Sequence, residues 1–225
     1  MKLLALDTSS NACSVAATDG EVVVESHVVE PREHTRLLVP MINRLLDELA
    51  VSLADLDAIV LGNGPGSFIG MRIGASVAQG LAFGSGVKIV QVSSLAAVAT
   101  EVMMSEQAER VVVAQDARMN QVYAGEFFCD EEDLPAIDGE ERIVASNFSF
   151  DSAAPFVAAG QGWQRYPDLL DGNRDALTRV SAVGLPRARF LLPGGRVAWA
   201  GGKAVDPADI VPAYLRSKVA EKPSA

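Results

Sequence analysis

The chain has few of the residues from which covalent cross-links and metal sites are built. Its 225 residues include two cysteines and two histidines. Cys13 and Cys129 lie far apart and form no Cys-x-x-Cys pair, so neither a disulfide framework nor a zinc site is predicted. His27 and His34 cannot form the i, i+4 pair that binds a metal on one helix face. We therefore expect reduced thiols and no metal centre in this chain.

Positive charge is also scarce. The sequence has 19 basic and 29 acidic residues, which gives a formal net charge of −10. Proteins that bind nucleic acid by themselves gain most of their affinity by neutralising phosphates with Lys and Arg. Long-range repulsion therefore disfavours nucleic-acid binding by this chain alone, unless its cations gather on one face.

Long apolar runs are absent as well. The longest stretch without a charged residue, 73–87, is too short to span a bilayer and contains Gly, Ala, Ser and Gln. The chain starts with a strand-like run and shows no signal-peptide pattern, so we expect a cytoplasmic protein without membrane contact. With 49% hydrophobic and 21% charged residues, it can bury a core large enough for two lobes.

Strand and helix patterns alternate in the first half of the sequence. A mixed sheet with flanking helices is predicted from strands at 2–7, 12–18, 21–29, 57–62 and 88–92 and from helices at 34–50, 71–83 and 93–104. A second strand–turn–strand unit at 111–129 resembles the opening of the chain, whereas 130–209 has weak signals. We predict an N-terminal lobe at 1–105 and a smaller, divergent lobe at 106–225, whose last segment packs back on the first lobe.

Two predicted helices are candidates for a partner interface. In the helix at 34–50, the apolar residues cover an arc of about 180°, against roughly 100° for an ordinary surface helix. Such a helix is either buried on two sides within the chain or packed on its own sheet and on a partner. The helix at 71–83 combines small residues on one side with an apolar row. The candidate contact residues are Leu38, Met41, Ile42, Leu45, Ile73, Val77 and Leu81.

A glycine-rich turn at 62–70 joins a predicted strand to the helix at 71–83. Such turns can cradle phosphate with backbone N–H groups. The P-loop pattern fails because no Lys follows, and the dinucleotide pattern fails because Ser67 stands at the place of the third Gly. Gly64, Gly66 and Ser67 therefore form a degenerate phosphate-type turn.

Several segments together identify a family. They are Leu-Ala-Leu-Asp-Thr-Ser at 4–9, Gly-Pro-Gly-Ser-Phe-Ile-Gly-Met-Arg-Ile-Gly at 64–74, Val-Ser-Ser-Leu at 92–95, Asp-Ala-Arg at 116–118 with Val122 and Tyr123, and Tyr-Leu-Arg at 214–216. This set resembles the TsaB (formerly YeaZ) family of bacterial tRNA threonylcarbamoyladenosine biosynthesis proteins. The similarity is dense from residue 1 to about 128, weak over 130–209, and returns at 212–216. At Ile69 the family usually has Thr, so a hydroxyl is lost from the turn.

The resemblance implies a two-lobed α/β fold of the actin/Hsp70/sugar-kinase type. It also implies a non-catalytic scaffold or activator that dimerises with TsaD, the subunit that transfers the threonylcarbamoyl group to adenosine 37 of tRNAs reading codons that start with A. A TsaE-like ATPase joins the assembly, tRNA is bound only through the complex, and the isolated chain can form a homodimer.

The resemblance predicts no catalytic, cofactor or metal residue in this chain, with ATP acting only in the assembled complex. Actin-like kinases carry Asp-x-Gly-Thr/Ser at the first hairpin, where the Gly lets backbone amides approach a phosphate. The sequence here is Asp7-Thr8-Ser9, with Ser9 in place of Gly, so it is a second degenerate phosphate-type turn. Asp7 and Asp116 either pair as kinase-like carboxylates or cap their turns. Two alternatives remain open: a stand-alone actin-like ATPase or small-molecule kinase, and a homodimeric regulatory protein.

Overall fold

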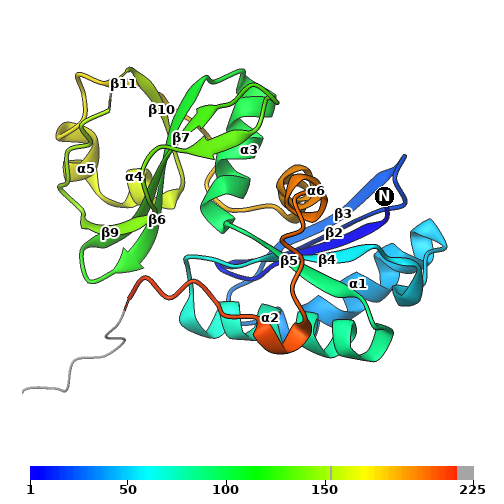
Figure 1. Cartoon of the computed structure of the whole chain (residues 1–225). Coiled ribbons are helices and arrows are strands. Elements are labelled where there is room, and N and C mark those ends of the chain that lie inside the picture. Colours follow the sequence, from blue (N-terminus) through cyan, green and yellow to red (C-terminus); the bar gives the residue numbers. More distant parts are fainter. Residues whose placement is uncertain (153, 217–225) are drawn as a thin grey trace, which may run out of the picture.

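The computed structural model describes residues 1–152 and 154–216, which form two β-sheets with helices packed around each (Figure 1). The first sheet has five strands in the order β3-β2-β1-β4-β5. β1, β2 and β3 are antiparallel neighbours, while β4 and β5 run parallel to β1, so the sheet is mixed. The strands are β1 (Leu3–Asp7), β2 (Ala12–Thr18), β3 (Val23–Val29), β4 (Ala58–Gly62) and β5 (Lys88–Val92).

Helices cover both faces of the first sheet. One face packs against α1 (His34–Leu49) and α2 (Phe68–Ser85) in the larger apolar core. The other face packs against the 3-10 helix η2 (Ala188–Leu191) and α6 (Leu192–Ala200). Two short 3-10 turns complete this lobe, η1 (Leu53–Asp55) and η3 (Pro207–Asp209). In the part of the chain that the structure describes, no helix combines the length and the hydropathy needed to cross a membrane.

The second sheet has six strands, with β11-β10-β6-β7-β8 in order and β9 paired to β7. It is also mixed, because β6 and β7 are antiparallel whereas β10 runs parallel to both β6 and β11. The predicted two-lobed α/β fold with a mixed sheet in each lobe is therefore confirmed. Its elements are α3 (Ser94–Glu106), β6 (Arg110–Arg118), β7 (Gln121–Cys129), β8 (Pro135–Ile137), β9 (Arg142–Ala145), β10 (Phe156–Ala159), α4 (Gln161–Arg165), α5 (Pro167–Asp171) and β11 (Leu177–Val180).

The lobes do not divide at residue 105 as the sequence predicts. α3 lies before that boundary, yet Leu95, Val98 and Val102 pack in one core with Val111 and Phe127 of the second sheet. Figure 1 shows α3 beside β7 and α6 against the first sheet. The helix joins the second lobe because its apolar residues contact strands that follow it in the chain.

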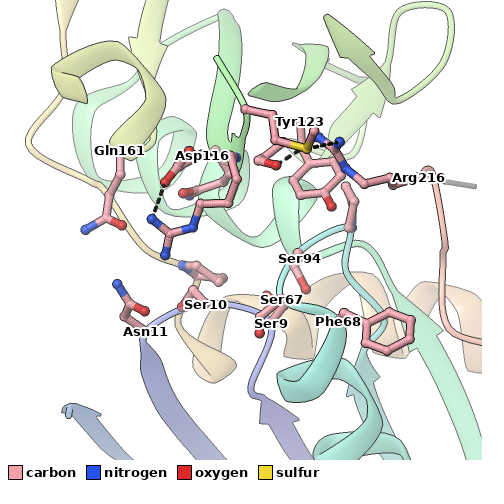
Figure 2. Close-up of a pocket in the computed structure, with 17 residues that line it drawn as sticks. Ser9, Ser10, Asn11, Ser67, Phe68, Ser94, Asp116, Tyr123, Gln161 and Arg216 are labelled. Carbon is pink, nitrogen blue, oxygen red and sulfur yellow. Dashed lines mark hydrogen bonds and ion pairs between the residues drawn. The ribbon is translucent and has the colours of Figure 1, made fainter. Parts of the chain in front are cut away.

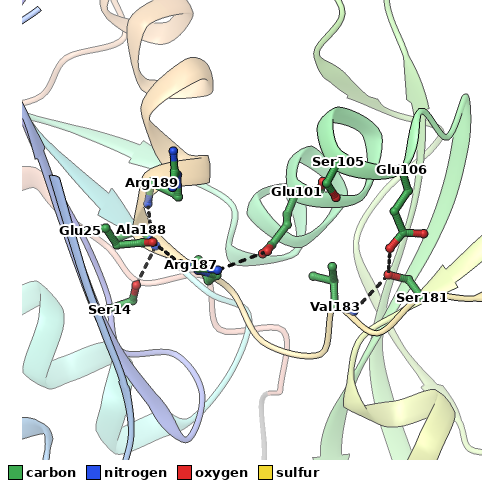
Figure 3. Close-up of polar contacts among 10 residues, drawn as sticks. All are labelled: Ser14, Glu25, Glu101, Ser105, Glu106, Ser181, Val183, Arg187, Ala188 and Arg189. Atoms are coloured by element: carbon green, nitrogen blue, oxygen red, sulfur yellow. Dashed lines mark hydrogen bonds and ion pairs between the residues drawn. The ribbon is translucent and has the colours of Figure 1, made fainter. Parts of the chain in front are cut away.

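A polar junction ties the lobes together on one side (Figure 3). Arg187 forms ion pairs with Glu25 of β3 and, at 3.7 Å, with Glu101 of α3. The backbone N–H of Ala188 donates to the hydroxyl of Ser14 on β2 at 2.8 Å. Burial raises the pKa of Glu101, and the positive charge of Arg187 opposes that rise. The junction fixes the segment that leads back to the first lobe.

Candidate functional site

A cavity of about 280 Å³ lies between the two lobes (Figure 2). The first lobe contributes the β1–β2 turn and the start of α2, and the second lobe contributes the β6–β7 hairpin and the start of α4. Polar side chains line much of it: Ser9, Ser10, Asn11, Ser67, Ser94, Gln115, Asp116, Arg118, Tyr123, Gln161 and Arg216. A cavity shared by two lobes is the natural place to look for a binding site.

The C-terminal part of the described chain closes one side of this cavity. Asn63 Nδ2 donates to the carbonyl of Val211 at 3.1 Å, which attaches the segment to the first lobe. Arg216 Nη2 donates to the carbonyl of Ala117 at 2.9 Å and to Gln121 Oε1 at 2.7 Å, both in the second lobe. The family-like Tyr-Leu-Arg segment thus bridges the two lobes.

The two predicted phosphate-type turns pack directly on each other at the cavity floor. The N–H of Ser67 donates to the carbonyl of Ser9 at 2.6 Å, and the hydroxyl of Thr8 donates to the carbonyl of Gly70 at 2.7 Å. A Cβ added at Gly66 would lie 2.2 Å from the Ser9 carbonyl oxygen, and one at Gly70 would lie 2.0 Å from that of Thr8. The glycines therefore permit close contact between two backbones, and the two turns occupy the space in which each could cradle a phosphate.

The predicted turn residues separate into two groups. Of the glycines in the 62–70 turn, Gly64 alone has a positive φ, +82°. Three of the six residues line the cavity and three lie behind its wall. The first group is Ser9, Gly66 and Ser67, and the second is Asp7, Thr8 and Gly64.

Asp7 is completely buried and does not reach the cavity. Its carboxylate accepts hydrogen bonds from the Ser9 N–H at 2.8 Å, the Ser9 hydroxyl at 2.7 Å and the Ser94 hydroxyl at 2.6 Å. Burial raises the pKa of this carboxyl, and the hydrogen bonds partly oppose the rise. Asp7 therefore connects the β1–β2 turn to the start of α3, and it shares no kinase-like site with Asp116, which lines the cavity.

The burial of Asp7 predicts a distinctive dependence of stability on pH. A carboxyl with a raised pKa binds its proton more tightly in the folded than in the unfolded state. Below the pKa that this carboxyl has in the unfolded chain, about 4, Asp7 contributes its full stabilisation to the free energy of unfolding. This stabilisation is lost as the pH rises through the pKa of the carboxyl in the folded chain. Urea unfolding should show wild-type stability falling relative to Asp7→Asn as the pH rises above about 4. A pH-independent difference would contradict this prediction, and the exposed-site control Asp175→Asn should follow the wild type.

Asp116 is held by four donors, one of which is the backbone N–H of Arg118, 2.9 Å from Oδ1. The Tyr166 hydroxyl donates to its Oδ1 at 2.8 Å, while Arg118 Nη1 and Arg165 Nε lie 3.1 and 3.3 Å from Oδ2. Burial raises the pKa of Tyr166, and its hydrogen bond to Asp116 raises it further. The carboxylate therefore organises the cavity wall and is not a free base. Residues 1–152 and 154–216 contain no group of three His, Cys, Asp or Glu side chains placed to hold a metal.

The predicted partner interface needs correction on α1. Its four candidates are between 0% and 6% exposed and belong to the core of this chain, so they have no surface to offer a partner. The wide apolar arc of α1 is thus explained by burial within the chain. The α2 candidates pack beside the same core but are only partly buried, and their contact with a partner stays a prediction. The α1 residues are Leu38, Met41, Ile42 and Leu45, and the α2 residues are Ile73, Val77 and Leu81.

Two of the predicted contact residues, Ile73 and Val77, belong to a larger exposed surface of α2, here called the α2 face, whose other residues the sequence did not single out as contacts. Ile69 and Phe83, at its two ends, are 69% and 86% exposed. The residues of this face carry no charge, but Arg72 is exposed at its edge, next to Ile69 and Ser76 on the helix surface. The charge-free stretch at 73–87 is the sequence signal that could have revealed the rest of the face. The α2 face comprises Ile69, Ile73, Ser76, Val77, Gly80, Phe83 and Gly84.

Comparisons with known proteins agree with these features. The family model described as "TsaD: tRNA N6-adenosine threonylcarbamoyltransferase" matches residues 24–161. The tRNA threonylcarbamoyladenosine biosynthesis protein TsaB of Escherichia coli K12 is 37% identical over 227 residues, covering 99% of this chain and 97% of that protein. TsaB of Haemophilus influenzae is 35% identical, covering 99% of this chain and 96% of that protein. YeaZ from Pseudomonas aeruginosa has a TM-score of 0.88 at 38% identity, covering 95% of this chain and 99% of that one. The chain belongs to the TsaB (YeaZ) family, within the broader TsaD-like family.

Proposed function

We propose that this chain is a non-catalytic scaffold subunit that binds a TsaD-like threonylcarbamoyltransferase through the α2 face and stabilises its active state. As a TsaB homologue, the chain takes part in the biosynthesis of threonylcarbamoyladenosine in tRNA. The product would be the modified adenosine at position 37 of tRNAs that read codons starting with A. Cytoplasmic tRNA implies that the chain works in the cytoplasm.

The observation that carries this proposal is the character of the α2 face. In a protein with 21% charged residues, this exposed helical surface ends in Phe83, a protruding aromatic residue, and the one charged side chain of α2, Arg72, lies at its edge. At Gly80 and Gly84 no atom lies within 4 Å of an added Cβ. A partner helix can therefore approach closely and bury apolar surface, as at the dehydrated centre of a protein interface.

The inter-lobe site supports a non-catalytic role. The Asp7 carboxylate is buried, and the Ser9 N–H, which would face a phosphate in a kinase, donates to Asp7 instead. Asp116 is already paired with arginines. We therefore assign group transfer to the TsaD-like subunit and ATP hydrolysis to a TsaE-like subunit. The net charge of −10 favours tRNA binding by those partners.

The same face fits a homodimer when the chain is alone. A two-fold pair buries identical patches, and two α2 faces can pack on each other through their uncharged residues, with Arg72 at the rim. The heterodimer and the homodimer would then compete for one surface. The homodimer would then form only when the α2 face is not occupied by the TsaD-like subunit.

Sedimentation velocity tests the proposal. Mixing the chain with the TsaD-like subunit of the same organism should replace any homodimer with a 1:1 heterodimer. Persistence of the homodimer without a heterodimer would overturn the partner assignment. Steady ATP turnover by the isolated chain would overturn its non-catalytic role.

A further inference from the structure

We infer that the inter-lobe cavity binds a small phosphate-bearing anion, held between Arg118 and Arg216 of the upper wall and the serine-rich floor. This ligand is additional to the proposed scaffold function, which does not depend on it. The site differs from the α2 face, so the two proposals can fail separately.

The charge of the cavity wall is opposite to that of the chain. The protein has a net charge of −10, yet two arginines and a single carboxylate line the cavity. That carboxylate, Asp116, is also paired with Arg165 at 3.3 Å. An excess of guanidinium groups in a concave site favours an oxyanion. Arg118 can turn from Asp116 to donate two parallel hydrogen bonds to phosphate oxygens. Arg216, whose Nη2 is held by two acceptors of the second lobe, contributes mainly its positive charge.

Hydrogen-bond donors on the floor remain available to a ligand. The Ser10 hydroxyl oxygen accepts from the Ala12 N–H at 3.1 Å, and the Ser67 hydroxyl oxygen accepts from the Gly70 N–H at 3.2 Å. In both cases the hydroxyl hydrogen can still point into the cavity. Figure 2 shows the Asn11 and Gln161 side chains on opposite walls, so donors from both lobes surround one space.

The backbone of the β6–β7 hairpin is unusual where Arg118 projects from it. Arg118, Met119 and Asn120 have φ values of 64°, 55° and 53°, the left-handed region that residues other than glycine rarely adopt. The strand pairing is irregular between Asp116 and Arg118. Positive φ at Met119 and Asn120 is the usual geometry of a two-residue hairpin turn, and this turn presents Arg118 at the edge of the cavity. The Arg118 side chain is 68% exposed, so it can move from Asp116 to a ligand without repacking a core.

Size and surroundings narrow the ligand class. About 280 Å³ accommodates a pyrophosphate group or a small phosphorylated metabolite rather than a macromolecular segment. Asp7 is shielded behind the turns, so the ligand would be bound without hydrolysis. Because it would contact Ser10 and Ser67 of one lobe and Arg118 and Gln161 of the other, it would stabilise one arrangement of the lobes and raise the melting temperature.

Calorimetric titration and thermal unfolding of the full chain with pyrophosphate test this inference at constant ionic strength. We expect saturable binding, a higher melting temperature, and at least tenfold weaker binding for Arg118→Gln. Asn11→Ala, on the opposite wall, should also weaken binding, whereas Arg44→Gln on the exposed surface of α1 should not. ADP, a nucleoside diphosphate, should bind through its diphosphate group, and adenosine should not.

Three results would overturn the inference. The first is the absence of saturable binding for pyrophosphate, inorganic phosphate and ADP. The second is equal pyrophosphate affinity for Arg118→Gln and Arg44→Gln. Citrate binding without pyrophosphate binding would overturn the assignment to phosphate. Each result can be read separately from heterodimer formation, which depends on the α2 face.

Discussion

Replacing Gly80 with arginine should weaken binding of the TsaD-like subunit at least 100-fold while leaving the chain folded. No atom lies within 4 Å of a Cβ at this position, so the single chain can hold the new side chain. Removing glycine from a helix interior favours the helix by up to about 1 kcal/mol, so the melting temperature should not fall. In the complex, the charged side chain would either be buried without a partner or hold the two surfaces apart.

Ala200→Arg is the matched control for this experiment. It adds the same side chain at an exposed helical position, on α6, which packs on the opposite face of the first sheet. Its affinity for the TsaD-like subunit should equal that of the wild type. Met41→Glu is unsuitable because Met41 is 6% exposed in the core, so lost binding would report lost folding. Wild-type affinity of Gly80→Arg would show that the partner binds elsewhere.

Gly66→Ala should destabilise the fold by about 3 kcal/mol or more, at the upper end of the cost of overpacking. The added Cβ would lie 2.2 Å from the Ser9 carbonyl oxygen, a backbone atom that cannot rotate away. The Ser67 N–H holds that same oxygen at 2.6 Å, so relief of the clash would break the contact between the turns.

Guanidinium chloride unfolding measures this effect against Gly84→Ala. Gly84 lies in α2 with no atom within 4 Å of an added Cβ, so alanine there should stabilise the chain by up to about 1 kcal/mol. The two variants carry the same chemical change and should differ in sign. A loss below 1 kcal/mol for Gly66→Ala would mean that the two turns can separate at little cost.

The sheet of the first lobe could be predicted because its signals are local. Buried strands such as 58–62 and 88–92 are short apolar runs next to turn residues, and the structure places strands at those positions. The start of α2 was predicted three residues late, at Met71. Ser67 caps the helix by accepting the Gly70 N–H, so Phe68, Ile69 and Gly70 are already helical.

The second lobe was harder to predict because its contacts are long-range. Four of its strands, β8, β9, β10 and β11, have three or four residues each. These are too few to show the alternation of apolar and polar residues that identifies a strand. β10 pairs with β6, more than forty residues earlier in the chain. The sequence of α3 does not indicate which lobe the helix packs on, because its apolar face could pack against the sheet of either lobe.

The site was only partly predictable for the same reason. Ser9 and Ser67 were identified from turn chemistry and do line the cavity. The place of Arg118 opposite them depends on how the lobes meet, which no spacing in the sequence encodes. The breadth of the apolar arc on α1 could not separate burial in this chain from burial against a partner.

Formation of threonylcarbamoyladenosine on tRNA is the most direct test of the scaffold role. Purified TsaD-like and TsaE-like subunits, supplied with threonylcarbamoyl-adenylate, ATP and unmodified tRNA, would be assayed with and without this chain. We expect multiple-turnover product formation with the wild type and with Ala200→Arg, and its loss without the chain or with Gly80→Arg. Equal product formation in the absence of the chain, or wild-type rates with Gly80→Arg, would contradict a scaffold that acts through the α2 face.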